Sequence, residues 1–379
     1  MRSVCIYPLF TQSGVCSQNT HHSSTQLKMN SPYAKELTVA IGALQKAAQL
    51  SQSIVSDKDK GAIEKDDLSP VTVADFAVQA LLTATIKNAF PEDKVVGEED
   101  ASDLRQNSVL MERVWQLLEG IAGDEDTVSL CKLPESREQM CDLIDECGAS
   151  SPSATGRTWV FDPIDGTKTY LLGQLYAINM ALLVDGEQTV GIVGAPNLSI
   201  DAQAPLKNEE IDPKDEGCIF FAAKGHGAYI RPLRTDQPRR LPLYTNQDTS
   251  LVTSSTVDSA LSGIHEIVAS RLNTPYPGND LLPWVLRWAV LAMGLGNTTV
   301  WVYKRRDRYA KAWDHAGAML LFEETGGKIT DVHGKKIDLT AGRKISANFG
   351  FVGAREGHER VLGVVREVLM EQGKEEFLK

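Results

Sequence analysis

The stretch TWVFDPIDGTKT, residues 158–169, is the most informative part of this chain. It opens with aromatic and β-branched residues, which are typical of a buried strand, and continues into a sharp turn. Proline fixes the backbone of that turn, so Asp162 and Asp165 can point to one side while the Ile164 carbonyl is left free to coordinate as well. The sequence therefore predicts a strand that ends in three closely spaced oxygen ligands.

The two residues after this turn extend the same chemistry. Gly166 allows the backbone to approach a ligand closely. Thr167 offers a hydroxyl and an amide beside the carboxylates, where a water molecule and a phosphate oxygen would need hydrogen-bond partners.

Further acidic residues stand at the ends of predicted elements elsewhere in the chain. The run KVVGEED, residues 94–100, reads as a short strand that delivers Glu98, and Asp75 and Asp314 stand where helices begin. The positive end of a helix favours an ionised carboxylate there. Any one of these acids alone is better explained as a helix cap or a solvated loop end, but the set predicts a site for Mg2+ or Mn2+.

The surrounding patterns predict alternating helices and strands. In the first half, the apolar period indicates helices over 33–55 and from near Asp75 to Pro91, and hairpins over 176–196 and 218–230. In the second half it indicates strands and helices in alternation, which favours α/β layers. Their ranges are 250–254, 298–303 and 327–331 for strands, and 258–272, 283–295 and 313–324 for helices.

Length and composition predict two joined halves in an ordinary globular chain. The 379 residues exceed what one core usually fills. We expect a disordered leader at 1–30, an α+β half at 31–235 that contains an acidic insertion at 101–157, and an α/β half at 236–379.

Charge and cysteine usage exclude several classes of protein. A formal charge of −11 is unlike a nucleic-acid or membrane surface, and no apolar run approaches the length of a membrane span. The six cysteines form no CxxC pair and no dense framework, so we expect reduced thiols and a cytosolic enzyme. An acidic protein that binds an anion must reverse its field locally, and carboxylates that hold divalent cations would do so.

Three motifs resemble one known family. GEE at 97–99, WVFDPIDGTK at 159–168 and KAWDHAGAMLLFEETGG at 311–327 are similar to signatures of the lithium-sensitive, magnesium-dependent inositol-monophosphatase superfamily, from about Tyr33 to the C-terminus. SPVTVAD, the DGTK ending and the long insertion resemble its 3'(2'),5'-bisphosphate nucleotidase branch. Fungal members of that branch hydrolyse 3'-phosphoadenosine 5'-phosphate to AMP and phosphate during sulfate assimilation.

The resemblance implies a fold, a cofactor and a set of roles. It implies a layered α/β/α/β/α sandwich with the site between the two halves, two or three Mg2+ ions, and in-line attack by water without a phosphoenzyme. Asp75 and Thr167 would activate the water. The metal ligands would be Glu98, Asp162, the Ile164 carbonyl, Asp165 and Asp314, and the substrate contacts would be Gly166, Thr167, Arg287 and Asp314.

The chain departs from the resemblance around the nucleotide pocket. Arg287 replaces a lysine and keeps a cation, but Trp284 stands in place of a serine, and Trp301 and Leu172 in place of arginines. The upstream histidine of the family is matched only by Ser259, or by His265 after a shift. We interpret Trp284, Trp288 and Trp301 as core residues rather than stacking surfaces, His315 as a packing or capping residue, and the basic run 304–308 as a solvated loop, with guidance of an anionic substrate as its alternative.

The leading hypothesis is hydrolysis of 3'-phosphoadenosine 5'-phosphate, and of its sulfated analogue, by a monomer or homodimer. The first alternative is an inositol-phosphate or other small-monoester phosphatase, which the changed pocket residues favour. The second is a non-catalytic binding protein that keeps the metal cluster only as structure, and the intact Asp75 and Thr167 argue against it.

Overall fold

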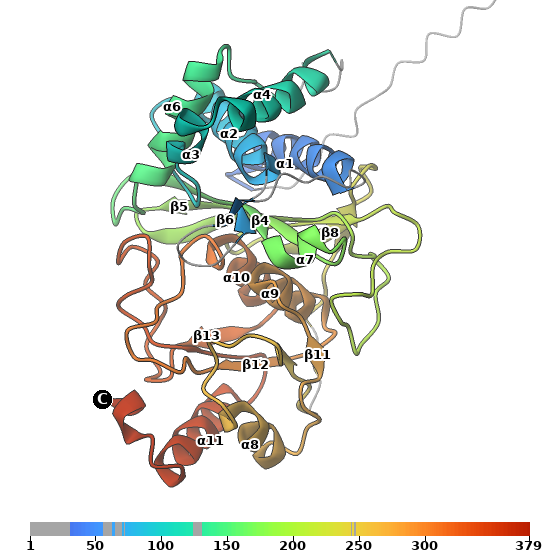
Figure 1. Cartoon of the computed structure of the whole chain (residues 1–379). Helices are drawn as coiled ribbons and strands as arrows, with labels where there is room; N and C mark the ends of the chain where they lie inside the picture. Colours follow the sequence, from blue (N-terminus) through green and yellow to red (C-terminus); the bar gives the residue numbers. More distant parts are fainter. Residues whose placement is uncertain are drawn as a thin grey trace, which may run out of the picture.

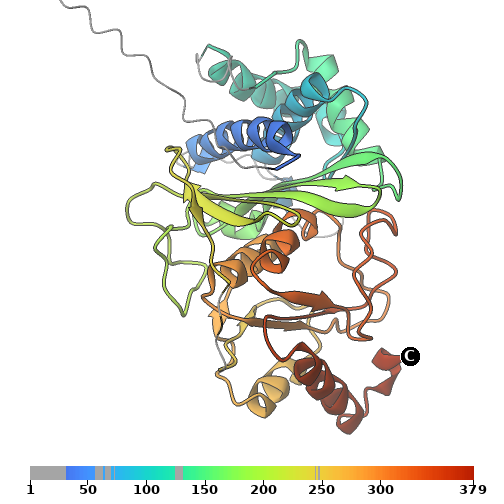
Figure 2. The same ribbon diagram turned by 180° about the vertical axis from the view of Figure 1, so that it is seen from behind.

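A computed structural model of the chain describes residues 31–55, 63–64, 70–71, 73–123, 131–243, 245 and 248–379. The leader predicted for residues 1–30 lies outside the described residues. Figure 1 shows the described residues as stacked layers of helices and sheets, and Figure 2 shows the same order from behind. The predicted layered α/β/α/β/α sandwich is confirmed.

A seven-stranded sheet forms the second layer and carries most of the expected ligands. Its strand order follows the chain, with β3 parallel to β4 and every later pair antiparallel. The strands are β3 (Lys94–Gly97), β4 (Arg157–Asp165), β5 (Ala177–Val184), β6 (Glu187–Ala195), β7 (Cys218–Ala223), β8 (Gly227–Pro232) and β9 (Arg239–Arg240).

This sheet is buried on both faces. Alternate side chains point to opposite sides of a strand, and in these strands both sets are apolar. Along β5, Ile178 and Met180 pack towards the N-terminal helices, whereas Ala181 and Leu183 belong to the core shared with the C-terminal half. The predicted hairpin between β5 and β6 is confirmed. Asp185 and Gly186 both have positive φ, 49° and 78°, as a tight two-residue hairpin turn requires.

Helices of the N-terminal half cover one face of the sheet (Figure 1). The two predicted long helices are present, and α2 ends just before Pro91, as expected. Within the predicted insertion the helix around Trp115 is confirmed, but a second long helix, α6, was missed because its apolar positions are sparse among acids. The helices are α1 (Ala34–Val55), α2 (Val73–Ala89), α3 (Ser102–Gln106), α4 (Ser108–Ala122) and α6 (Arg137–Ala149).

The C-terminal half supplies the remaining layers. Helices α9 (Trp284–Met293) and α10 (Ala316–Glu323) pack on the other face of the large sheet (Figure 2). Beyond them lies a small antiparallel sheet in the order β12-β14-β13, formed by Thr298–Trp301, Phe351–Ala354 and Lys328–Thr330.

Short elements complete the described structure. The helix predicted over 258–272 is shorter than expected and begins only at Ile264, because Gly263 precedes it in a left-handed conformation. The outermost elements are α8 (Ile264–Arg271), α11 (His358–Glu371) and the 3-10 turn Glu375–Leu378. The remaining elements are β1 (Ile63–Glu64), β2 (Pro70–Val71), α7 (Thr167–Leu171), β10 (Val252–Thr253) and β11 (Asn279–Asp280). Among the described residues, no helix has both the length and the apolar character to cross a membrane.

Candidate active site

A cavity of about 340 Å3 brings together nearly all of the site residues predicted from the sequence. This volume falls within the range of small-molecule sites. The predicted residues that line it are Glu98, Asp162, Ile164, Asp165, Gly166, Thr167, Arg287 and Asp314. The exception is Asp75, which is buried in the first turn of α2. Burial is the largest cause of the raised pKa of Asp162, and the charge of Asp75 adds to it. The residues predicted from the sequence as site residues thus lie around one cavity, apart from Asp75.

The end of β4 gives the predicted turn its shape. Pairing between β4 and β5 shifts register between Asp162 and Asp165, which interrupts the regular ladder at the acidic turn. Gly166 follows with φ 85°, and a Cβ there would lie 2.5 Å from the Pro283 side chain, so glycine is required. The Ile164 carbonyl is not entirely free, because it accepts the Thr167 hydroxyl at 3.3 Å, but a carbonyl oxygen has a second lone pair.

Burial and mutual repulsion raise the pKa of the acidic side chains around the cavity. Burial raises the pKa of Asp162 well above its usual value, and the charges of Glu98 and Asp165 add to the effect. Burial likewise raises the pKa of Asp314 to about 7, against the opposing charge of Lys311. Carboxylates held this close together are stable as anions only beside positive charge.

Asp165 is held by the start of a helix from the other half of the chain. The amide of Val285, in the first turn of α9, donates to Asp165 Oδ2 at 2.6 Å. Burial and the charge of Asp314 raise the pKa of Asp165, whereas the Val285 amide and the Arg287 charge oppose the rise. The N-terminus of α9 thus stabilises the ionised form of an expected ligand.

Glu98 is held by two cations that the sequence analysis did not select. Lys311 Nζ lies 3.0 Å from Glu98 Oε1, and both side chains are mostly buried, at 26% and 15% exposed. Arg343 Nη2 donates to the carbonyl oxygens of Gly97 at 2.7 Å and Glu98 at 3.1 Å. Lys311 stands only three positions before Asp314 in the quoted motif, so its place in the sequence was a usable signal. Arg343 gave no local signal.

The donor set fits a divalent metal in its chemistry. Carboxylates and one carbonyl supply hard oxygen atoms, and Asp162 Oδ1 is buried without a hydrogen-bond partner among the described residues. Among the described residues, however, no three His, Cys, Asp or Glu side chains are arranged closely enough to hold a metal ion in this conformation. Asp162, Asp165, Glu98 and Asp314 therefore surround the cavity as candidate ligands, with Lys311 as a cation already paired to one of them.

Arg287 lies in an aromatic wall of the cavity. Its guanidinium is fully buried and stacks 4.0 Å from the Trp284 ring and 4.7 Å from the Trp301 ring. Nε and Nη2 donate to the carbonyls of Leu281 and Leu282, at 2.7 and 2.9 Å, and Nη1 has no partner in the described residues. Nη1 is thus a buried donor beside the cavity that has no acceptor among the described residues.

The other aromatic and histidine residues follow their predicted structural roles. Trp288 and Trp301 are fully buried, and of the three tryptophans only Trp284 lines the cavity. His315 is buried and accepts the indole N–H of Trp288 at 3.0 Å, so it packs rather than caps. His265 is also buried and accepts the Val302 amide, whereas Ser259 lines the cavity.

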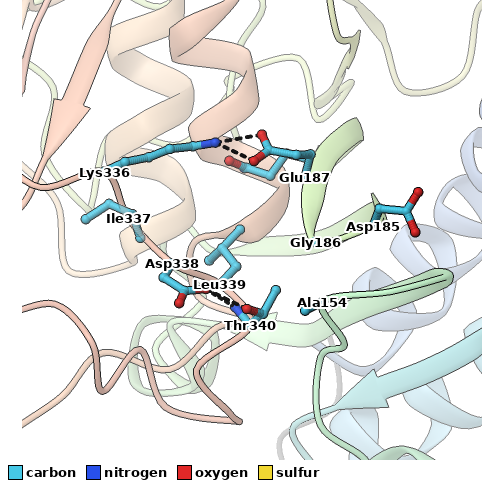
Figure 3. Close-up of a pocket in the computed structure, with 10 residues that line it drawn as sticks. Ala154, Asp185, Gly186, Glu187, Lys336, Ile337, Asp338, Leu339 and Thr340 are labelled. Atoms are coloured by element: carbon cyan, nitrogen blue, oxygen red, sulfur yellow. Dashed lines mark hydrogen bonds and ion pairs between the residues drawn. The ribbon is translucent and has the colours of Figure 1, made fainter.

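A second hollow, of about 220 Å3, lies at the β5–β6 turn (Figure 3). It is lined by that turn and by the segment 336–340. Its charged groups already have partners, since Lys336 contacts Glu187 at 2.6 Å and Asp338 accepts from Thr340 (Figure 3). The cavity at the end of β4 is therefore the better candidate for chemistry.

Comparison with known proteins agrees with the fold and the site. Residues 33–370 match the model of the inositol monophosphatase family, and the chain belongs to that family. Enzymes of this family are generally metal-dependent phosphatases.

The curated relatives are more specific. The chain is 35% identical to a 3'(2'),5'-bisphosphate nucleotidase of Emericella nidulans, over 89% of this chain and 99% of that protein. It is 33% identical to one from Schizosaccharomyces pombe, over 85% of this chain and 92% of that protein. Among solved structures, an IMPase of Thermotoga maritima matches with a TM-score of 0.56 and 20% identity, over 89% of this chain and 99% of that one, which supports the fold.

Proposed function

We propose that this protein is a phosphomonoesterase that converts 3'-phosphoadenosine 5'-phosphate to AMP and phosphate. The names of its curated relatives support a bisphosphonucleotide substrate. We extend the proposal to 3'-phosphoadenylyl sulfate, which carries the same 3'-phosphate. A small phosphorylated compound is the substrate class that a cavity of about 340 Å3 with both carboxylates and cations suits.

One observation carries this proposal. Four carboxylates from distant parts of the chain and four cationic side chains line the same cavity. The carboxylates attract divalent metal ions, and the cationic side chains attract the phosphate groups of a substrate. The two sets of side chains together suit a metal-assisted reaction of a phosphorylated compound. The carboxylates are Glu98, Asp162, Asp165 and Asp314, and the cations are Lys168, Arg287, Arg308 and Lys311.

We propose two or three Mg2+ ions as the cofactor, with Glu98, Asp162, the Ile164 carbonyl, Asp165 and Asp314 as ligands. Bound divalent ions would lower the pKa of water and stabilise the attacking and leaving oxygens. The remaining roles, activation of water and contact with the substrate, belong to side chains and backbone groups of the protein.

Asp75 and Thr167 are the proposed water-activating pair. Asp75 accepts the proton of the attacking water, and the Thr167 hydroxyl orients that water beside Ile164. Water oxygen bonds to phosphorus, the bond from phosphorus to the 3'-oxygen breaks, and that oxygen takes up a proton from solvent, to which Asp75 returns the proton it accepted. Gly166, Thr167 and Asp314 contact the reacting phosphate, and Arg287 Nη1 donates to a substrate oxygen.

An inositol-phosphate phosphatase is the second candidate. The observation that favours it is that Trp284 lines the cavity in place of a hydroxyl residue, with the buried Trp301 packed against it in place of an arginine. An aromatic edge suits the ring of a cyclitol as well as that of a base. We propose a cytosolic location, on composition and cysteine usage, and a monomer or homodimer as the assembly.

Phosphate release by the purified protein tests this proposal. With Mg2+ and 3'-phosphoadenosine 5'-phosphate, we expect stoichiometric AMP and phosphate, and no adenosine 3'-phosphate, which would indicate cleavage at the wrong position. EDTA should stop the reaction, and Asp162→Asn serves as the blank. Metal-independent release, or equal release by Asp162→Asn, would contradict the proposal.

A further inference from the structure

The four cations that line the cavity are not equivalent. Lys311 is paired with Glu98, and Arg287 is buried with two of its donors on backbone carbonyls. Lys168 and Arg308 are exposed, and neither side chain has an ion pair or a hydrogen bond within the described residues. Two positive charges therefore face the cavity without an ion-pair partner within hydrogen-bond reach in the described residues, although the charge of Arg308 acts on Asp314.

The basic run at 304–308 shows the same contrast within five residues. Lys304 is paired with Asp258 at 2.6 Å, and Arg305 with Asp307 at 2.9 Å. Arg306 donates to the carbonyl oxygen of Lys379 at 2.9 Å. Of these cations only Arg308 lines the cavity. The prediction of a solvated loop thus describes the first three cations, and the alternative, guidance of an anion, suits the fourth.

Lys168 and Arg308 reach the cavity from different halves of the protein. Lys168 belongs to α7 and directly follows Thr167, at the end of the acidic turn. Arg308 lies in the segment between β12 and α10, and Tyr303 and Tyr309 of that segment also line the cavity. Burial raises the pKa of the Tyr303 phenol, and the charge of Arg308 is among those that oppose the rise. The guanidinium therefore acts on the interior of the cavity.

We propose that Lys168 and Arg308 form a subsite for the second, non-reacting phosphate of a bisphosphate substrate. The inference rests on the proposed function, because it assumes that the reacting phosphate lies at the carboxylates. A phosphate dianion is best matched by two cations, and arginine can bind it with two parallel hydrogen bonds. The subsite also offers an anion a positive entry into a protein of net charge −11.

A matched pair of substrates tests the subsite. 3'-Phosphoadenosine 5'-phosphate and adenosine 3'-phosphate share the reacting group and differ only in the second phosphate. In Arg308→Met we expect kcat/KM for the bisphosphate to fall by about 10- to 100-fold, the effect of losing a charged hydrogen bond, and kcat/KM for the monophosphate to fall far less. Lys168→Met should act in the same direction, and Arg308→Lys should recover part of the loss.

Arg305→Met is the matched control, since it removes another exposed cation of the same run, one that is paired with Asp307. It should alter neither substrate. Raised salt should reduce the preference of the wild-type protein for the bisphosphate, because exposed charges are screened. An equal loss on both substrates in Arg308→Met, no loss on either, or a wild-type protein that does not favour the bisphosphate would overturn the subsite.

Failure of the proposed function gives a different pattern. If neither adenosine compound is hydrolysed, inositol 1,4-bisphosphate and inositol 1-phosphate replace them in the same comparison. A selective loss on the bisphosphate then supports the subsite while the nucleotide assignment fails. Calorimetry can make the comparison without turnover, by measuring how tightly each mono- and bisphosphate binds to Asp162→Asn and to the double variant that also carries Arg308→Met. An equal change in the affinity for mono- and bisphosphate overturns the subsite.

Discussion

Arg343 Nη2 donates to the carbonyl oxygen of Glu98 at 3.1 Å, and so joins the C-terminal half of the chain to the strand end that carries an expected metal ligand. Its other nitrogen, Nη1, donates to the carbonyls of Cys147 and Ser150, both at 3.1 Å. The guanidinium also stacks 4.6 Å from the ring of Trp313, the neighbour of Asp314. One side chain therefore contacts the backbone of Glu98 and the segment of Asp314.

Arg343→Met should weaken metal binding. Residues that orient metal ligands typically contribute about 10- to 100-fold in metal affinity, and we expect a loss of that size by calorimetry with Mg2+ or Mn2+. Arg157→Met is the control, because Arg157 also holds two acids, Asp93 and Glu36, but at the far end of β4. A similar loss of metal affinity in both variants would indicate general destabilisation instead.

Metal should stabilise the protein more as the pH rises. Burial raises the pKa of Asp314 from 3.8 to about 7, so the metal-free folded state carries a poorly tolerated charge above that pH. Its free energy of unfolding therefore falls as pH rises between those two values. The increase in Tm caused by Mg2+ over EDTA should grow from about pH 5 to about pH 8, and less so in Asp314→Asn. A constant or shrinking increase would contradict this linkage.

Asp75→Asn should separate catalysis from metal binding. As the proposed proton acceptor, Asp75 contributes to kcat, and its loss should lower kcat by about 100- to 10,000-fold. Metal affinity should change far less than in Asp162→Asn, which loses an expected ligand. Thr167→Val should resemble Asp75→Asn. The assignment is wrong if Asp75→Asn loses metal affinity and kcat to the same degree as Asp162→Asn.

Arg287→Met should affect stability and all substrates together. The change leaves the carbonyls of Leu281 and Leu282 without their buried donor, so we expect the free energy of unfolding to fall by about 2 kcal/mol or more. Activity should fall on mono- and bisphosphates alike, as judged by kcat/KM on both. A loss confined to the bisphosphate would instead place the second phosphate at Arg287.

The sequence predicted the acidic turn and its surroundings well because those features are local. Pro163 and Gly166 are typical of a turn, and aromatic and β-branched residues stand before them, so Asp162 and Asp165 could be placed at a strand end from spacing alone. The hairpin at Asp185 was predictable for the same reason. Each depends on neighbours in the chain.

Some of the features that escaped prediction depend on partners far apart in sequence, and others are local. Arg343 is an unremarkable residue of a loop until folding brings it against Glu98. The Ile164 carbonyl proved to accept Thr167, and α6 is too polar for its apolar face to be recognised. Likewise, the difference between Arg308 and Arg305 appears only when the cavity wall and the position of Asp307 are known.

The most direct test of the central claim compares kcat/KM for 3'-phosphoadenosine 5'-phosphate with kcat/KM for inositol 1-phosphate and inositol 1,4-bisphosphate, at equal Mg2+ and with Asp162→Asn as the blank. We predict a strong preference for the nucleotide, and loss of its hydrolysis when EDTA is added. A preference for either inositol phosphate would show that the wall of Trp284 and Arg287 selects another ring, and would contradict the nucleotide assignment.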